Sequence, residues 1–353
     1  MAVTQEGSPG ISAPTDGRKT AGLSSSETTA IAKLGGRLLQ PNRGVPLNLD
    51  WVREVRVNTS AVERRAASHV ARRTVKKEWQ AAWLLRAITC MDLTTLSGDD
   101  THERVRRLCA KARRPLQQEI EQKLGIETLG IKVAAVCVYH TFVETALRAL
   151  EGSGIRVAAV STGFPAGLSP LSERINEIRR SVESGAQDID VVITRAHVFG
   201  GKWQELHDEI AAFKNACGPA HLKVILGTGD LLTLRNVARA SFVAMMAGAD
   251  FIKTSTGKEP VNATLPVGFV MTRAIREYAL ETGMAVGFKP AGGIRTAKQS
   301  VEWLALMKEE LGPSWMQAEL FRFGASGMLA DIERQLEHHA TGRYSADYRH
   351  PIA

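Results

Sequence analysis

The chain of 353 residues lacks the features that would take it to a membrane or out of the cell. Its longest apolar runs, such as residues 133–138, fall far short of the roughly 20 residues that a membrane-spanning helix needs. The first residues contain no basic stretch followed by an apolar core, so no secretory leader is expected. These absences predict a cytoplasmic protein without a membrane partner.

Cysteine and histidine are few, and their spacing is not that of metal ligands. The four cysteines, at positions 90, 109, 137 and 217, form no CxxC motif, and the nine histidines form no HxH or HExxH motif. Zinc sites usually show such spacing, so we expect no metal and no other cofactor. We interpret the cysteines as structural thiols, except that Cys137 lies in a run that leads toward the expected site.

Aromatic residues are absent from the basic segments, which argues against a nucleic-acid partner. The net charge is +8, and residues 1–86 alone carry 14 Lys and Arg against 7 Asp and Glu. The basic pairs at 64–65, 72–73 and 76–77 have no interleaved aromatic residues on which bases could stack. A solvated helical face explains this charge better, so nucleic acid is disfavoured as a partner.

The composition divides the chain into three parts. Residues 1–45 are rich in Gly, Ser, Thr, Ala and Pro, which predicts a flexible extension with one short helix over residues 29–39. Residues 46–345 form the main domain, and it begins with helical patterns over residues 51–85. Residues 346–353 form a C-terminal tail.

After residue 86, apolar β-branched runs alternate with segments of helical period such as 171–184, 203–217 and 267–282. Strand followed by helix requires parallel strands, and eight such units over about 250 residues match a closed barrel. An open doubly wound sheet is the alternative, but no GxGxxG motif follows the first run. We therefore predict an α/β fold, a (β/α)8 TIM barrel with extra N-terminal helices. Its eight strands are expected at 87–93, 133–139, 156–162, 188–193, 222–227, 249–255, 285–291 and 320–326.

Two lysines, Lys253 and Lys289, lie in the runs expected to be the sixth and seventh strands, and small, Gly-rich sequence follows each. A lysine buried at a strand end costs several kcal/mol unless the site uses it. Alternation along the strands places Lys253, Lys289 and Asp190 on the inward face, near the C-terminal mouth where barrel active sites lie. Three such residues together predict a reaction centre, although a purely structural cluster of paired charges is the alternative.

We predict that Lys253 is a nucleophilic amine and that Lys289 is the cation that activates it. A second ammonium about 6 Å away costs roughly 2.8 kcal/mol at an effective dielectric of about 20, which lowers the lysine pKa by about two units. Burial lowers the pKa further, so that the amine can attack an aldehyde. Asp190 would carry protons, and Asp92 would orient Lys289 or a substrate hydroxyl.

Glycine-rich sequence lies at or after the last three runs, and it predicts a phosphate site. Barrels often bind phosphate with the loops after strands seven and eight, where only glycine lets backbone N–H groups approach closely. Lys258, which follows the sixth strand, would add a point charge. The residues concerned are Gly257, Lys258, Gly292, Gly293, Gly324 and Ser326.

From about residue 50 to residue 345 the chain resembles the deoxyribose-phosphate aldolase family in its longer, animal-like form. The segments that carry the resemblance include residues 91–96, 163–167, 188–192, 249–258, 287–295 and 321–326. The resemblance implies a metal-independent class I aldolase of deoxynucleoside catabolism. Its reaction is the reversible cleavage of 2-deoxy-D-ribose 5-phosphate to D-glyceraldehyde 3-phosphate and acetaldehyde.

The resemblance also assigns roles to single residues. Lys253 matches the Schiff-base lysine, Lys289 the lysine that perturbs it, and Asp190 the proton-relay aspartate. The glycine-rich residues named above, with Lys258 and Ser326, match the phosphate-binding positions. Asp92, Cys137 and Thr254 are further candidates for contact with the substrate, a small phosphorylated sugar or aldehyde.

Two departures from the family pattern bear on function. Gly327 stands where a second Ser or Thr is usual, which removes one hydroxyl donor and predicts a modestly higher Michaelis constant. The short form of the family ends in a tyrosine thought to reach the site. Here the tail continues past Tyr344 and Tyr348 to Ala353, so neither is given that role.

Two other functions stay open from the sequence. One is a Schiff-base barrel aldolase for a different phosphorylated aldehyde or ketone. The other is a non-catalytic scaffold or nucleic-acid binder with a basic N-terminus. The sequence leaves the oligomeric state open, a homo-oligomer included.

Overall fold

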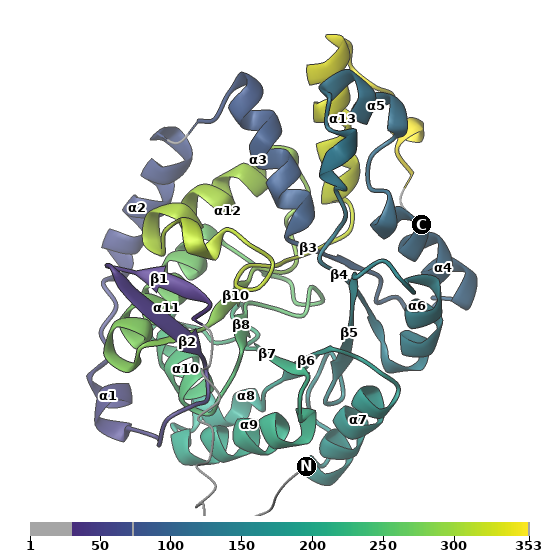
Figure 1. Cartoon of the computed structure of the whole chain (residues 1–353). Helices are drawn as coiled ribbons and strands as arrows, with labels where there is room; N and C mark the ends of the chain where they lie inside the picture. Colours follow the sequence, from purple (N-terminus) through teal and green to yellow (C-terminus); the bar gives the residue numbers. More distant parts are fainter. Residues whose placement is uncertain (1–29, 73, 352–353) are drawn as a thin grey trace, which may run out of the picture.

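A computed structural model describes residues 30–72 and 74–351, and its centre is a ring of eight parallel strands (Figure 1). Around the ring the order is β10-β8-β7-β6-β5-β4-β3-β11. Phe288 pairs with Phe321, and Ala291 with Gly324, so β10 and β11 meet and the ring closes. The strands are β3 (Met91–Thr94), β4 (Ala135–Tyr139), β5 (Arg156–Ser161), β6 (Asp188–Val192), β7 (His221–Ile225), β8 (Phe251–Lys253), β10 (Gly287–Lys289) and β11 (Phe323–Ala325). The predicted TIM barrel is confirmed.

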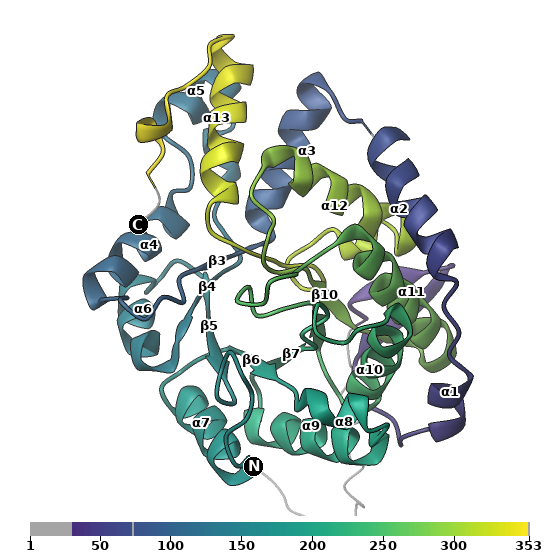
Figure 2. The ribbon, with the colours of Figure 1, turned by 180° about the vertical axis from the view of Figure 1, so that it is seen from behind.

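Helices surround the strands, as the view from behind shows (Figure 2). The predicted helical segments correspond to α7 (Leu171–Glu183), α9 (Trp203–Cys217) and α11 (Leu265–Thr282). The remaining helices of the barrel are α4 (His102–Arg113), α5 (Gln118–Leu124), α6 (Val143–Ala149), α8 (Arg195–Phe199), α10 (Leu234–Met246), α12 (Ala297–Glu310) and α13 (Met328–Thr341).

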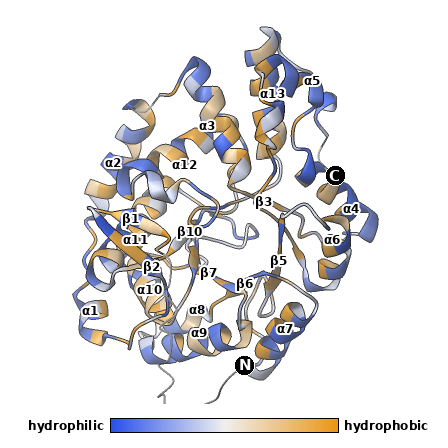
Figure 3. Ribbon diagram, in the orientation of Figure 1, coloured by the Kyte–Doolittle hydropathy of each residue, from blue (hydrophilic) through white to orange (hydrophobic). Residues whose placement is uncertain are grey.

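The hydropathy of the ribbon follows this arrangement (Figure 3). Apolar residues gather on the strands and on the inner helix faces, as with the fully buried Ile178 of α7, while polar residues face outward. In the described part of the chain, no helix combines the length and the apolar character needed to cross a bilayer.

The extra N-terminal helices that the sequence predicts are present, and the described residues before the barrel contain three: α1 (Leu49–Glu54), α2 (Thr59–Arg72) and α3 (Lys77–Thr89). Helix α2 packs against α11, and α3 packs against α12 and α13. The first strand begins later than predicted, because residues 87–89 are the last turn of α3. A short apolar run fits a buried helix end as well as a strand, so its pattern alone could not place this boundary.

The prediction of a short helix over residues 29–39 is wrong. Strands β1 (Ala32–Leu34) and β2 (Arg37–Pro41) form an antiparallel hairpin instead, and β2 pairs with β9 (Met284–Ala285), just before β10. Gly35 and Gly36 both have positive φ, 55° and 86°, as a tight hairpin turn requires. The part of the predicted extension from residue 30 onward is therefore attached to the barrel. The prediction for residues 1–29 lies outside the described residues.

Candidate active site

Lys253 and Lys289 end neighbouring strands and are paired in register. Their side chains point into the barrel, since both ammonium groups donate to Oδ2 of Asp190, at 2.7 Å from Lys253 and 2.8 Å from Lys289. The predicted convergence of the three residues is therefore what the structure has. Two residues before the lysines, Gly287 leaves room for the Phe251 ring of the neighbouring strand, because a Cβ there would lie 2.3 Å from it.

Asp92 completes the upper part of the cluster. Its Oδ2 accepts a hydrogen bond of 2.5 Å from Lys289, so the predicted orienting contact is present. Lys289 is thus held between two carboxylates, those of Asp92 and Asp190, and is fully buried.

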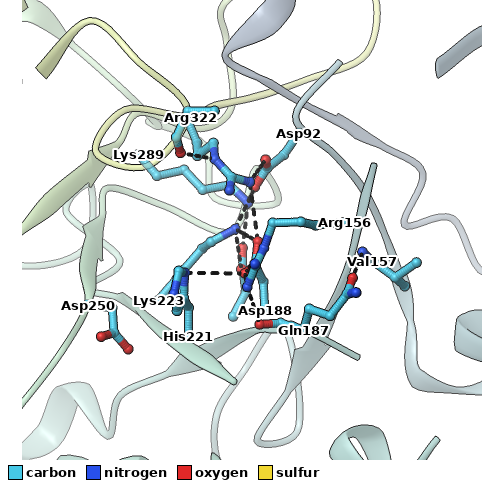
Figure 4. A network of polar contacts seen from close by, with 12 residues as sticks. Asp92, Arg156, Val157, Gln187, Asp188, His221, Lys223, Asp250, Lys289 and Arg322 are labelled. Atoms are coloured by element: carbon cyan, nitrogen blue, oxygen red, sulfur yellow. Dashed lines mark hydrogen bonds and ion pairs between the residues drawn. The ribbon is translucent and has the colours of Figure 1, made fainter. Parts of the chain in front are cut away.

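Two buried cations that the sequence interpretation missed, Lys223 and Arg322, join this group through Asp92 (Figure 4). Lys223 of β7 donates to Asp92 at 2.9 Å and to Asp188 at 2.7 Å. Arg322, just before β11, donates to the same two carboxylates at 2.7 and 3.2 Å. Lys223 has the inward parity of its strand, between Leu222 and Val224, and that pattern could have revealed it.

The charges of this cluster leave Lys253 as the surplus cation. The buried carboxylates of Asp92, Asp188 and Asp190 are matched by three buried cations, Lys223, Lys289 and Arg322. The partly exposed Arg156 also binds Asp188, at 2.6 Å. A fourth buried ammonium has no carboxylate of its own, because Asp190 also binds Lys289. An uncompensated charge away from water is costly, so the neutral amine of Lys253 is favoured.

The pKa directions agree with this balance. Burial lowers the pKa of Lys253, and the charge of Lys289 adds to that effect, so the pKa lies below its usual value although Asp190 opposes both. Burial alone would also lower the pKa of Lys289, but Asp190 and Asp92 outweigh it and raise that pKa. Burial would raise the pKa of Asp190, but the lysines lower it to about 2. Near neutral pH, Lys289 is thus an ammonium and Asp190 a carboxylate.

A pocket of about 620 Å³ opens above Lys253, and it collects the predicted phosphate residues. It is lined by loops after β8, β10 and β11, the arrangement in which barrels bind phosphate. Arg295, which the sequence interpretation did not select, adds a guanidinium to this lining. The predicted residues among its walls are Gly257, Lys258, Gly292, Gly293, Gly324 and Ser326, and Gly327 lies beside them.

At two of these positions, 292 and 324, the space around the backbone admits only glycine. Gly292 has φ +79°, and a Cβ there would lie 2.7 Å from the Asn262 side chain. A Cβ on Gly324 would lie 2.7 Å from that of Ala291. A larger residue at either position would push the loops apart or fill the pocket.

Two further candidates for contact with the substrate, Thr254 and Cys137, lie outside the lining of this pocket. The Thr254 hydroxyl donates to the carbonyl of Ala291 at 3.3 Å and accepts from its N–H at 3.0 Å, which ties the loop after β10 to β8. Cys137 is fully buried, and burial raises the pKa of its thiol. Neither lines the pocket, so these contacts favour structural roles.

The remaining cysteines, histidines and acids offer no metal centre in the described part of the chain, where no three such side chains are grouped to hold an ion. Cys90, Cys109 and Cys217 are buried with unpaired thiols. Burial raises the pKa of Cys90 and of Cys217 to about 12. These thiols have the character predicted for them.

The tail lies against α13, held by His350. Its Nε2 lies 2.7 Å from Oε2 of Glu337, and the ring is almost completely buried. Tyr344 stacks on His338, and both Tyr344 and Tyr348 are more than four-fifths exposed. Neither tyrosine lines the pocket.

Comparison with known proteins identifies the family. Residues 86–326 match the model of the DeoC/LacD family aldolases. The human deoxyribose-phosphate aldolase is 58% identical over 314 residues, covering 88% of this chain and 99% of that protein.

Two solved structures share the fold. A putative deoxyribose-phosphate aldolase from Toxoplasma gondii covers 76% of this chain and 97% of its own, with TM-score 0.63 at 21% identity. The deoxyribose phosphate aldolase from Aeropyrum pernix, described as a unique tetramer, covers 75% and 98%, with TM-score 0.53 at 22% identity. The resemblance seen in the sequence is therefore confirmed: the chain belongs to the DeoC/LacD family of aldolases, and it is a lyase.

Proposed function

We propose that the protein is a class I aldolase that reversibly cleaves 2-deoxy-D-ribose 5-phosphate to D-glyceraldehyde 3-phosphate and acetaldehyde. The observation that carries this proposal is the position of Lys253. It is the surplus cation of a balanced buried cluster, and its side chain also lines the pocket that holds the predicted phosphate residues. The 58% identity to the human enzyme supports the choice of substrate.

The reaction begins at the neutral amine of Lys253, which attacks the substrate aldehyde carbon C1. Loss of water gives a protonated imine, and this group accepts the electron pair of the C2–C3 bond as that bond breaks. The C3 hydroxyl loses its proton and becomes the aldehyde of glyceraldehyde 3-phosphate. The enamine left on Lys253 is protonated at C2, and water releases acetaldehyde, so the water lost at the start is returned.

Asp190 and Lys289 serve the proton transfers in this scheme. Asp190, a carboxylate with a pKa of about 2, accepts hydrogen bonds from both lysines and can pass a proton through a water to the adduct. Lys289 keeps its charge and disfavours an ammonium on Lys253. Lys258 and Arg295 supply positive charge for the phosphate.

The proposal also covers the pathway, the cellular location and the independence of metal. The resemblance in sequence supports a role in deoxynucleoside catabolism, a cytoplasmic location and a reaction that needs no metal.

A trapping experiment tests the imine directly. The protein is incubated with acetaldehyde and borohydride, and the modified peptide is located by mass spectrometry. We expect a stable ethyl group on Lys253 and none in Lys253→Ala, which should fold but lack cleavage activity. A folded wild-type protein that traps no acetaldehyde would overturn the proposal.

A substrate panel tests the choice of sugar. The panel compares 2-deoxyribose 5-phosphate with other phosphorylated aldehydes and ketones under the same conditions. The highest kcat/KM is expected for 2-deoxyribose 5-phosphate. A clear preference for another member would leave the imine chemistry in place and replace the substrate.

A further inference from the structure

The loop after β8 contains a carboxylate, that of Glu259, which is hydrogen-bonded within the loop. Oε2 of Glu259 accepts hydrogen bonds from the backbone N–H of Thr256 at 3.0 Å and of Gly257 at 3.2 Å. The Thr256 hydroxyl donates to the same oxygen at 2.6 Å, and Oε1 accepts from Thr256 N–H at 3.1 Å. Three donors thus converge on one carboxylate.

Their arrangement is that of an anion-binding nest. Successive backbone N–H groups next to a left-handed residue form a concavity that suits phosphate or carboxylate, and Gly257 has φ +87°. The N–H of Lys258 is engaged as well, since it donates to the Thr256 hydroxyl at 3.0 Å. The loop therefore offers the amides that an anion needs, and Glu259 already holds them.

The nest adjoins the phosphate pocket. Thr256, Gly257 and Lys258 all line that pocket. Its described lining also includes the basic side chains of Lys253 and Arg295 and no carboxylate. Glu259 does not line the pocket itself, but its carboxylate is hydrogen-bonded to the lining residues Thr256 and Gly257. A phosphate that arrives at this loop therefore meets the negative charge of Glu259.

We propose that Glu259 is a specificity-determining residue that lowers the affinity of the site for phosphate. Its carboxylate competes with the substrate phosphate for the N–H groups of Thr256 and Gly257 and repels the dianion when both are present. The inference deepens the proposed function, because it assumes that this pocket takes the phosphate group. Weaker binding of phosphate also favours release of the phosphorylated product.

Glu259→Gln tests the proposal, because glutamine has nearly the same shape and keeps one acceptor oxygen for the loop while it removes the charge. The matched control is Glu173→Gln, which removes the same charge from an exposed position in the first turn of α7. Binding of inorganic phosphate is measured by calorimetry, and KM and kcat are measured with 2-deoxyribose 5-phosphate and with unphosphorylated 2-deoxyribose.

We expect Glu259→Gln to bind inorganic phosphate about three- to tenfold more tightly, with a similar fall in KM for the phosphorylated sugar. The kcat/KM for 2-deoxyribose and all constants of Glu173→Gln should stay unchanged. Unchanged or weaker phosphate binding by Glu259→Gln overturns the inference and assigns the residue a purely structural role in the loop. An equal change for the unphosphorylated sugar, or no phosphate binding by either protein, overturns it too.

The two proposals fail separately. Calorimetry with inorganic phosphate needs no catalytic turnover, so it decides the role of Glu259 even if the sugar is not cleaved. Acetaldehyde trapping on Lys253 needs no phosphate, so it decides the imine chemistry even if Glu259→Gln behaves as the wild type does.

Discussion

Lys253 and Lys289 donate to the same carboxylate oxygen, Oδ2 of Asp190, from neighbouring positions on β8 and β10. Their surroundings differ, because Lys289 has a second carboxylate in Asp92 and Lys253 does not. Two equal side chains at one register position are thereby given opposite pKa shifts. This separation is what the proposed chemistry needs, one amine free to attack and one fixed cation.

Removal of the fixed cation should move the pH profile. Burial and Lys289 lower the pKa of Lys253, and Asp190 raises it. In Lys289→Leu the contribution of Lys289 is lost while the other two remain, so the pKa of Lys253 rises. Attack needs the neutral amine, so the acidic limb of kcat/KM against pH should shift upward, with lower activity near neutral pH. An unmoved acidic limb in a folded variant would contradict the coupling.

Lys223 is expected to act on stability. In Lys223→Met, the buried carboxylates of Asp92 and Asp188 each lose a hydrogen-bonded cation, which should cost about 3–5 kcal/mol of unfolding free energy. Urea unfolding measures the loss. Lys202→Met, at an exposed position, is the control and should change stability by less than about 0.5 kcal/mol. Equal stability of the two variants would show that the remaining cations compensate the two carboxylates without Lys223.

The buried aspartates predict how stability depends on acid. The pKa of Asp190 is about 2 in the folded protein, against about 3.9 in an unfolded chain. A depressed pKa stabilises the fold above pH 4, and this contribution, roughly 2–3 kcal/mol for a shift of this size, is lost as the pH falls from about 4 to about 2. The difference in unfolding free energy between wild type and Asp190→Asn should therefore shrink over that range. A difference that stays constant would refute the linkage.

Strand alternation was sufficient to predict the upper part of the cluster. Asp190, Lys253 and Lys289 alternate with apolar residues in clear runs, so their inward direction and convergence followed from a period of two. Arg322 lies in the run predicted as the eighth strand, two residues before Gly324, so the same alternation also places it inward. Its carboxylate partners come from distant strands, and local sequence does not indicate them. The bonds of Glu259 depend on the fold of one loop around Gly257, which no periodicity describes.

The hairpin β1–β2 has a turn pattern in the sequence that the composition of residues 1–45 outweighs. Gly35 and Gly36 separate two short runs, a pattern typical of a tight turn between strands, but the Gly- and Ser-rich composition before it favoured an extension. Pairing of β2 with β9 brings together residues about 240 positions apart, and local sequence carries no information on such a contact.

Gly327→Ser should restore the hydroxyl that the family pattern has at this position. Gly327 lines the phosphate pocket, has φ −61° and precedes α13, and an added Cβ would meet no atom within 4 Å. Serine therefore fits without strain. A hydroxyl that donates to the phosphate should lower KM for 2-deoxyribose 5-phosphate about two- to fivefold, which corresponds to the free energy of a weak hydrogen bond. The kcat should not change, because the phosphate lies away from the reacting carbons.

A gain confined to the phosphorylated substrate would identify the end of the pocket that binds it. Serine at the start of α13 can also stabilise the helix by a few tenths of a kcal/mol, and thermal unfolding measures that effect separately. The inert control is Gly327→Ala, which adds the Cβ without the hydroxyl and should leave KM near that of wild type. If alanine lowers KM as much as serine does, the helix and not the hydroxyl is responsible. If neither changes KM, the phosphate is bound away from this loop.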